Sequence, residues 1–286
     1  MQLGRYGIWW SGSWRAEDRS AGEVAHEMEQ LGYSALWSSG RFQPGIHPLF
    51  SELLAGTDHA VVATGILSVW INDPAAVAAQ VESFGARGER FLLGIGASHA
   101  PVVEPTGQRY ARPLTKVREF LRGLGAATPA VVNDRRIVAA LRPKMLRLAA
   151  EESLGAHPYF VPVEHTARAR ELLGPGPVLA PEVAVVLDAD AERARSAARS
   201  HTTGYLGLEN YANNLVALGW PHDDLPHGGS DRLVDAIVPH GNAAAVARRL
   251  REHLEAGADH VSVQVVREGG RDFPLEEYRE LAAELF

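Results

Sequence analysis

The feature that most constrains the fold of this 286-residue chain is a repeated alternation of short apolar runs with longer stretches of helical periodicity. Short apolar runs that end at Gly, Pro or Ser predict buried strands. The run over 60–69 is apolar almost throughout, which is typical of a strand covered on both faces. Strands are predicted over 4–10, 35–37, 60–69, 91–96, 137–141, 156–161, 182–187 and 260–266.

Apolar residues spaced by three and four positions fill the segments between these runs. In residues 74–87, Asp73 is a suitable N-cap and Pro74 suits the first helical position. Helices are predicted over 16–31, 48–54, 74–87, 114–124, 143–152, 164–173, 191–202, 208–218, 231–237, 242–255 and 275–285.

Eight strands alternating with helices indicate an α/β protein built as a (β/α)8 barrel. The alternative is an open, doubly wound sheet. We expect a single domain over 1–286, because no linker or change of composition interrupts the pattern. Insertions follow the fourth strand (97–112) and the seventh, and in a barrel both lie on the C-terminal face, where active sites form.

Composition excludes several kinds of site. The chain has no Cys, which excludes disulfides, thiolate metal ligands and a Cys nucleophile. Its net charge of −7 argues against non-specific nucleic-acid binding. The sequence shows no secretory signal and no apolar run long enough to span a bilayer, so we expect a cytoplasmic protein without a membrane partner.

The predicted strand ends are rich in aromatic and small residues and poor in carboxylates. Trp9, Trp10 and Trp70 lie at the ends of the first and third strands. These side chains could line a ligand site, and the alternative is that they pack in the core. Aromatic walls and close backbone approach at Gly suit a flat ring system. We therefore expect a ring-shaped ligand at this end of the barrel.

Motifs for other chemistries are weak. Gly94-Ile95-Gly96 starts like a dinucleotide fingerprint, but His99 stands where the third Gly belongs. His99 and His157 could be ligands or acid/base groups, yet no HxH, HExxH or GxSxG pattern occurs, so no metal is expected. His99 is a candidate proton donor. The alternative is that it is a buried loop histidine with only a structural role. Glu104, in the insertion after the fourth strand, is the acidic residue nearest to His99 in the sequence. On a loop, such a residue is more typical of a solvated charge.

Several segments together resemble the luciferase-like flavin and deazaflavin oxidoreductases, in the branch that uses coenzyme F420. The resemblance covers nearly the whole chain. It rests on Leu31 to Trp37, Ala63 to Ile66 with Ser68 to Trp70, Asn72 to Pro74, Arg90 to Pro101 with Gly107, Tyr110, Pro113 and Leu114, and Gly155 to Tyr159.

This resemblance implies a barrel with a helical insertion after the seventh strand and a deazaflavin ring, or alternatively the flavin FMN, at its C-terminal mouth. A non-prolyl cis peptide behind the ring is expected at Ser68-Val69. The expected cofactor-binding residues are Trp9, Ser39, Gly40, Ser68, Val69, Trp70, Asn72, Gly96, Ala97, Ser98, His99, Gly155, Ala156 and His157.

The chain departs from the family pattern after the second strand. Several relatives carry an Asp-His pair there that assists proton transfer, and here Ser39-Gly40 stands in its place. His99 becomes the candidate catalytic residue. Arg41, Arg109 and Arg112 are candidates to meet the anionic cofactor tail, with plain surface charges as the alternative.

Four functions stay open from the sequence. The first is an F420-dependent oxidoreductase that exchanges a hydride with a small organic substrate. The others are an FMN-dependent reductase or monooxygenase, a cofactor-binding protein without turnover, and a metal-dependent hydrolase. The expected partner is a small molecule, and because relatives often dimerise, the resemblance also suggests a homodimer.

Overall fold

The fold is a parallel sheet wrapped by helices. The structure, a computed structural model, describes residues 1–16, 18–40, 44–270 and 272–286. Its strands are β1 (Tyr6–Trp10), β2 (Ala35–Ser38), β3 (Val61–Thr64), β4 (Leu67–Ser68), β5 (Phe91–Gly96), β6 (Arg136–Val138), β7 (Gly155–Ala156), β8 (Val178–Leu179), β9 (Glu182–Val185) and β10 (Val261–Val265).

The sheet closes into a barrel. Its strand order is β8-β7-β6-β5-β3-β2-β1-β10-β9, with β4 paired to β5, and the pairs are parallel. The two ends of this order, β8 and β9, are separated in the chain by only Ala180 and Pro181. Ala180 N–H donates to Ala156 O at 2.9 Å, and Ser262 N–H donates to Pro181 O at 3.0 Å, so both edges of this strand are paired. The predicted (β/α)8 barrel is confirmed.

Strand register sets which side chains fill the barrel. Trp9 pairs with Trp37, Trp37 with Ala63, and Ala63 with Leu92, so these residues form one level of the interior. All four belong to one buried cluster. The neighbouring strand residues, such as Ile8 and Leu36, belong to the larger cluster that includes the surrounding helices.

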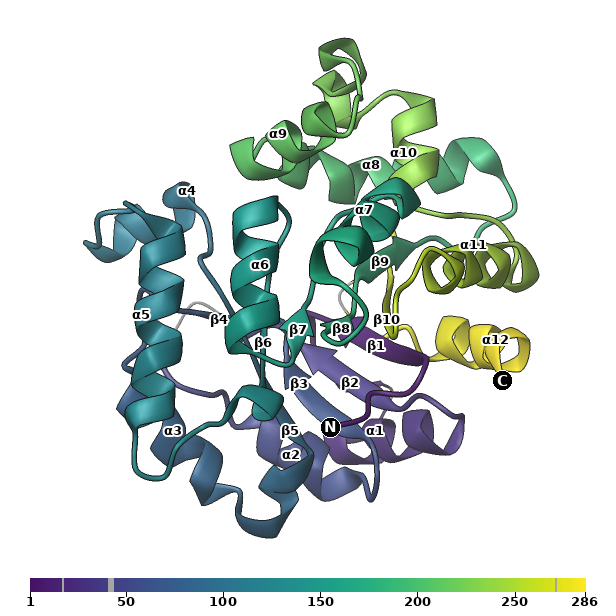
Figure 1. The fold of residues 1–286 in the computed structure, drawn as a ribbon. Coiled ribbons are helices and arrows are strands. Elements are labelled where there is room, and N and C mark those ends of the chain that lie inside the picture. The colour runs from purple at the N-terminus through teal and green to yellow at the C-terminus, as the bar shows by residue number, and fades with distance from the viewer. Residues whose placement is uncertain (17, 41–43, 271) are drawn as a thin grey trace.

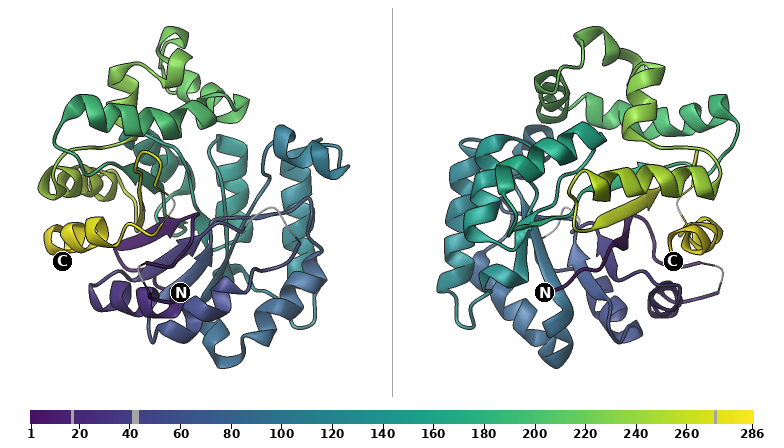
Figure 2. Two further views of the ribbon diagram at one scale, coloured as in Figure 1. Left: turned by 180° about the vertical axis from the view of Figure 1, so that it is seen from behind. Right: turned by 45° about the vertical axis from the view of Figure 1, so that its right-hand side comes forward.

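Helices surround the sheet, as Figures 1 and 2 show. They are α1 (Ala21–Gln30), α2 (Leu49–Gly56), α3 (Pro74–Ser83), α4 (Ala100–Val103), α5 (Pro113–Ala126), α6 (Pro143–Glu152), α7 (Val163–Leu173), α8 (Ala191–Leu206), α9 (Glu209–Ala217), α10 (Asp231–Ile237), α11 (Ala243–Glu255) and α12 (Leu275–Leu285). Short 3-10 turns are η1 (Gly85–Arg90), η2 (Glu104–Thr106), η3 (Asn133–Arg135), η4 (His222–Asp224) and η5 (Pro226–Gly228).

Both predicted insertions are present. The first, between β5 and α5, contains α4 and η2, whereas the sequence predicted only a loop there. The second contains α8, α9 and α10, which gather at one end of the molecule (Figure 1). A cluster that includes Phe160, Ala198, Tyr211 and Leu233 packs this second insertion against the strand ends.

The third predicted strand, 60–69, is two strands. β3 ends at Thr64 and β4 starts at Leu67, and the cis peptide bond joins Gly65 to Ile66. The expectation of a cis bond at Ser68-Val69 was therefore wrong. Gly65 suits the break because a Cβ there would lie 2.2 Å from Trp9 Nε1. Ser68 and Val69 instead run alongside β5, where Val69 N–H donates to Gly96 O at 3.1 Å.

Several predicted boundaries also shift. The first helix starts at Ala21 and not at residue 16, because Ser20 and Glu23 form a capping box. The fifth and sixth strands are short, β6 and β7, and Pro158 stands two residues beyond the end of β7. The predicted Asp73 N-cap is confirmed, since its carboxylate accepts from Ala76 N–H at 2.9 Å.

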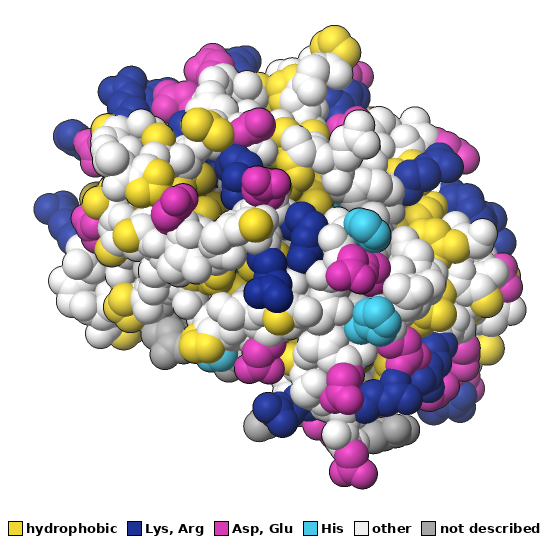
Figure 3. Space-filling model, turned by 90° about the horizontal axis from the view of Figure 1, so that it is seen from below, with side chains coloured by type: hydrophobic (Ala, Val, Ile, Leu, Met, Phe, Trp, Pro, Cys, Tyr) yellow, Lys and Arg dark blue, Asp and Glu magenta, His cyan; other side chains and the backbone are white. Residues whose placement is uncertain are grey.

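The outer surface carries charges of both signs. On the face shown in Figure 3, acidic and basic side chains are interspersed and do not gather by sign. Within the described residues, no helix combines the length and the apolar character needed to cross a membrane.

Candidate active site at the strand ends

A cavity of about 490 Å³ lies at the carboxyl ends of the strands. This is the end of a parallel barrel at which ligand sites form. Its walls come from the strand ends and from both insertions. The lining residues are Trp9, Ser39, Gly65, Ile66, Ser68, Gly96, Ala97, Ser98, His99, Val102, Tyr110, Pro113, Ala139, Ala140, Leu141, Arg142, Met145, His157, Tyr159, Tyr205, Leu208, Asn210 and Tyr211.

The break between β3 and β4 brings Ile66 into this cavity. A Cβ on Gly96 would lie 2.9 Å from Ile66 Cδ1, and one on Gly94 would lie 1.9 Å from Thr64 O. The two glycines of β5 therefore let the Gly65-Ile66 segment lie directly against that strand. The result is a wall of backbone and one aliphatic side chain, which suits the face of a flat ring.

His157 lines the cavity and lies in a buried aromatic stack. Its ring packs on Trp37 with centroids 4.3 Å apart and an interplanar angle of 10°. Nδ1 donates to Ala180 O at 2.6 Å, and burial lowers the pKa of His157 to about 4. The ring is therefore neutral at pH 7, and its Nε2 is an acceptor without a partner among the described residues.

Trp9 supplies a complementary group. Its indole Nε1–H is buried and has no acceptor among the described residues. A buried polar group left unpaired costs about 1–3 kcal/mol. One unpartnered donor and one unpartnered acceptor, on side chains that line the same cavity, match a ligand that brings both a carbonyl and an N–H.

His99 joins the two insertions. It follows β5, and its Nδ1 lies 3.0 Å from Oδ1 of Asn210 at the start of α9. Its ring also lies 5.3 Å from that of Tyr211. Burial lowers the pKa of His99, and the hydrogen bond to Asn210 partly offsets this effect. His99 is therefore neutral at pH 7.

Tyr159, which follows β7, and tyrosines of the second insertion line the cavity. Tyr159 OH donates to Gln264 Oε1 at 2.8 Å and lies 2.9 Å from Tyr205 OH. The nearby carboxyl of Glu182 accepts from Phe160 N–H at 3.3 Å, and burial raises its pKa to about 8. Glu182 is thus protonated at neutral pH, so this region adds no negative charge to the cavity.

Arg142 brings positive charge to the cavity. Among the described residues that line the cavity, it is the only Lys or Arg. It is the N-cap residue of α6, whose first position is Pro143. A helix N-terminus together with a guanidinium favours a phosphate or carboxylate.

The structure separates the sequence-predicted residues into two groups. Trp9, Ser39, Ser68, Gly96, Ala97, Ser98, His99 and His157 line the cavity, and Gly40, Val69, Trp70, Asn72, Gly155 and Ala156 do not.

The second group shapes the cavity from outside. Trp70 Nε1 donates to Ala97 O at 2.7 Å, and Asn72 Nδ2 donates to Ser68 O at 2.8 Å. A Cβ on Gly40 would lie 2.5 Å from Ile66 O, and one on Gly155 would lie 1.9 Å from Val178 O. Val69 and Ala156 are buried in the cluster outside the barrel.

Two of the three predicted cationic residues lie away from the cavity. Arg109 and Arg112 are exposed and do not line the cavity, as is also true of Glu104. Arg41 lies outside the described residues. Sequence reasoning missed Arg142, although its place directly after a predicted strand and before Pro143 was a usable signal. It also missed Tyr205, Asn210 and Tyr211, because sequence periodicity does not predict how an insertion packs over the strand ends.

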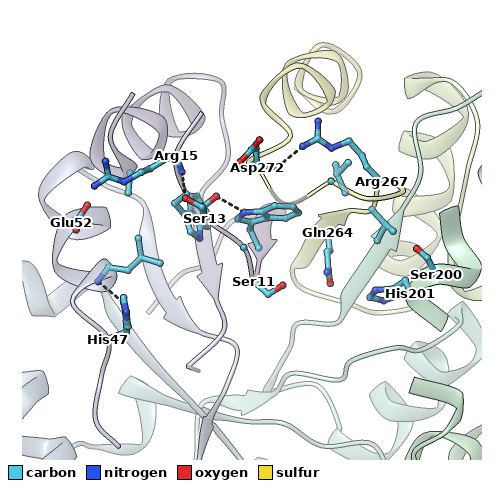
Figure 4. Close-up of a pocket in the computed structure, with 18 residues that line it drawn as sticks. Ser11, Ser13, Arg15, His47, Glu52, Ser200, His201, Gln264, Arg267 and Asp272 are labelled. Carbon is cyan, nitrogen blue, oxygen red and sulfur yellow. Dashed lines mark hydrogen bonds between the residues drawn. The ribbon is translucent and has the colours of Figure 1, made fainter. Parts of the chain in front are cut away.

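A second cavity of about 840 Å³ opens between the segments that follow β1 and β10 and helices α2 and α8 (Figure 4). Ser11, Gln264 and His201 point toward the same region in this view. Gln264 lines this cavity and bonds Tyr159, which lines the first, so the two cavities share a wall. The indole N–H groups of Trp10 and Trp14 are bonded to Ser13 O and Ser38 Oγ.

Among the described residues, metal ligands do not gather at either cavity. In the part of the chain that the structure describes, no three His, Asp or Glu side chains are grouped so that they could hold a metal ion. The first cavity is the candidate cofactor site, because it combines aromatic and aliphatic walls with a few convergent polar atoms.

The fold is a (β/α)8 barrel with a candidate ligand site at its strand ends, and a comparison with family models identifies its class. Residues 11–260 match the model of the luciferase-like monooxygenase family. The chain therefore belongs to that family of oxidoreductases. No curated protein matches the chain in sequence.

Solved structures share the fold at low identity. An F420-dependent secondary alcohol dehydrogenase, in complex with an F420-acetone adduct, is 16% identical with a TM-score of 0.72 over 100% of this chain and 98% of its own. The F420-dependent tetrahydromethanopterin reductase of Methanopyrus kandleri is 14% identical with a TM-score of 0.67 over 99% and 98%. The oxygenating constituent of 3,6-diketocamphane monooxygenase from Pseudomonas putida, in complex with FMN, is 15% identical with a TM-score of 0.66 over 99% and 99%.

Proposed function

We propose that this protein is an F420-dependent oxidoreductase that exchanges a hydride with a small organic substrate. The observation that carries the proposal is the cavity at the strand ends, with its wall at Gly65-Ile66 and the unpartnered polar atoms of Trp9 and His157. The family membership and the F420-dependent structural neighbours support it.

The residues present fit a deazaflavin. The pyrimidine part of such a ring carries carbonyl acceptors and an N–H donor. Trp9 Nε1–H would donate to a carbonyl, and His157 Nε2 would accept from the ring N–H. Ile66 and the adjoining backbone would lie against one face of the ring, and Ala97 and Ala139 leave room beside it.

The chemistry itself would come from the cofactor, since a deazaflavin accepts or donates a hydride and the amino acids of this cavity cannot. Arg142 and the start of α6 would bind its anionic tail. The tyrosines over the cavity would keep water from the reacting atoms. His99 would take or give the proton that accompanies hydride transfer at the substrate.

FMN is the second candidate cofactor. The diketocamphane monooxygenase neighbour has FMN bound, and FMN offers the same pyrimidine edge and a phosphate. The protein would then be a reductase or an oxygen-activating monooxygenase.

Spectra and titration separate these candidates. We expect the purified protein to lack a flavin absorption band and to bind F420 more tightly than FMN by at least about tenfold, which corresponds to about 1.4 kcal/mol. Fluorescence titration of both cofactors measures this ratio. A purified protein that carries FMN, or tighter binding of FMN, would replace the first candidate with the second. Binding of neither cofactor would reject both.

A further inference from the structure

The contact between His99 and Asn210 joins segments that are 111 positions apart in the sequence. His99 follows β5 in the first insertion, and Asn210 lies in the first turn of α9 in the second. Both side chains line the cavity at the strand ends. The bond therefore fixes a histidine at the place where, under the proposed function, substrate and cofactor meet.

The chemistry of the amide sets the state of the imidazole. Oδ1 of Asn210 can only accept a hydrogen bond, so Nδ1 of His99 must carry the proton. In a neutral ring Nε2 then holds the lone pair. Nε2 has no partner that the structure records among the described residues, which leaves it open to a ligand.

We propose that Asn210 is a positioning residue that holds His99 as the Nδ1–H tautomer, so that Nε2 accepts a hydrogen bond and then a proton from a hydroxyl-bearing substrate. This inference rests on the proposed function. In the oxidation of an alcohol, the O–H proton passes to Nε2 and the carbon-bound hydrogen leaves with its electron pair as hydride to the oxidised cofactor. The C–O bond becomes C=O, and the reverse reaction returns both.

Two tyrosines that line the cavity with His99 do not compete for this role. The titratable side chains that line the cavity with it are Tyr110, Arg142, His157, Tyr159, Tyr205 and Tyr211. Burial raises the pKa of Tyr110 and Tyr211, so both stay neutral at pH 7. Burial also lowers the pKa of His99, so it is present as a base at that pH.

The tautomer can be measured without turnover. Long-range ¹H–¹⁵N correlation spectra of the full chain, with His99→Gln to identify the signal, report which ring nitrogen is protonated. We expect Nδ1–H in the natural protein, loss of this preference in Asn210→Leu, and an upward shift of the His99 pKa by about one unit in Asn210→Asp. A predominant Nε2–H tautomer, or an unchanged tautomer in Asn210→Leu, would overturn the proposal.

The substrate class is tested on the same samples. Cyclohexanol brings an O–H donor, and cyclohexanone is its matched partner without one. With F420 present, we expect cyclohexanol to move the Nε2 signal of His99 and cyclohexanone to leave it in place. An Nε2 signal that does not move with the alcohol contradicts a hydroxyl-bearing substrate.

Controls keep the outcomes distinct. Tyr211→Phe keeps the ring beside His99 and removes only a hydroxyl, so it should retain the natural tautomer. F420 titrations of every variant show whether the cofactor site is intact. Failure of all proteins to bind F420 rejects the proposed function, whereas normal F420 binding with the wrong tautomer rejects only this inference.

Discussion

Arg142 is the residue on which recognition of an anionic cofactor tail depends most directly. It lines the cavity as the N-cap residue of α6, whereas Arg109 and Arg112 do not line the cavity and Arg41 lies outside the described residues. A hydrogen bond to a charged group contributes about 1.5–3 kcal/mol.

We expect Arg142→Gln to weaken F420 binding by about tenfold or more, because a charged contact to the phosphate is lost. Binding of the phosphate-free deazaflavin alcohol should change little. Fluorescence titration of both compounds measures the difference, and Arg112→Gln is the matched control. An equal loss of affinity for the two compounds would show that Arg142 stabilises the fold and does not bind the tail.

The buried carboxyl of Glu182 makes the stability of the folded protein depend on pH. Burial raises its pKa to about 8 from the ordinary value of 4.5. Between these values the unfolded chain ionises while the folded protein keeps the proton. The contribution of Glu182 to stability is therefore complete below pH 4.5 and is lost progressively as the pH rises toward 8.

Glu182→Gln removes this dependence, since the amide does not ionise. We expect the melting temperature of the variant, relative to the natural protein, to be higher at pH 8 than at pH 5. The amide oxygen can still accept from Phe160 N–H. Thermal unfolding at the two pH values tests this, and a difference of the opposite sign would mean that Glu182 is ionised in the folded protein.

At the scale of elements, the break between β3 and β4 shapes the cavity wall. Periodicity could not reveal it, because an apolar run has the same composition whether or not the backbone bends within it. The constraint lies in a tertiary contact, namely the 2.2 Å that would separate a Cβ on Gly65 from Trp9 Nε1.

Gly65→Ala should therefore displace the Trp9 indole. We expect a loss of stability of about 1–3 kcal/mol, typical of overpacking, together with weaker F420 binding. Chemical denaturation and cofactor titration measure the two effects. Gly204→Ala is the control, because a Cβ there meets nothing within 4 Å and the residue lies inside α8. A Gly65→Ala protein as stable as the natural one would contradict this packing.

For the molecule as a whole, the sequence predicts the barrel but not the details of its mouth. Alternating strands and helices repeat around the barrel, so errors at single boundaries, such as 16 against 21 for the first helix, leave the topology intact. That residues 1–286 form a single domain stays a prediction.

The site is predictable only where it follows the strand ends. Trp9, Ser98, His99 and His157 line the cavity because they lie at or just beyond the ends of strands. Asn210 comes from the second insertion, whose position over the cavity depends on long-range packing. Trp70 and Asn72 bond the neighbouring backbone from outside the cavity, a distinction that requires coordinates.

The central claim is that the cavity at the strand ends binds the deazaflavin. The most direct test is an F420 titration of the natural protein, of Ala97→Phe, which fills the cavity, and of Ala100→Phe, which lies beside it but does not line it. We predict that Ala97→Phe loses F420 affinity by more than about 100-fold, equivalent to about 2.7 kcal/mol, and that Ala100→Phe binds as the natural protein does. Unchanged F420 binding by a folded Ala97→Phe protein would contradict the claim.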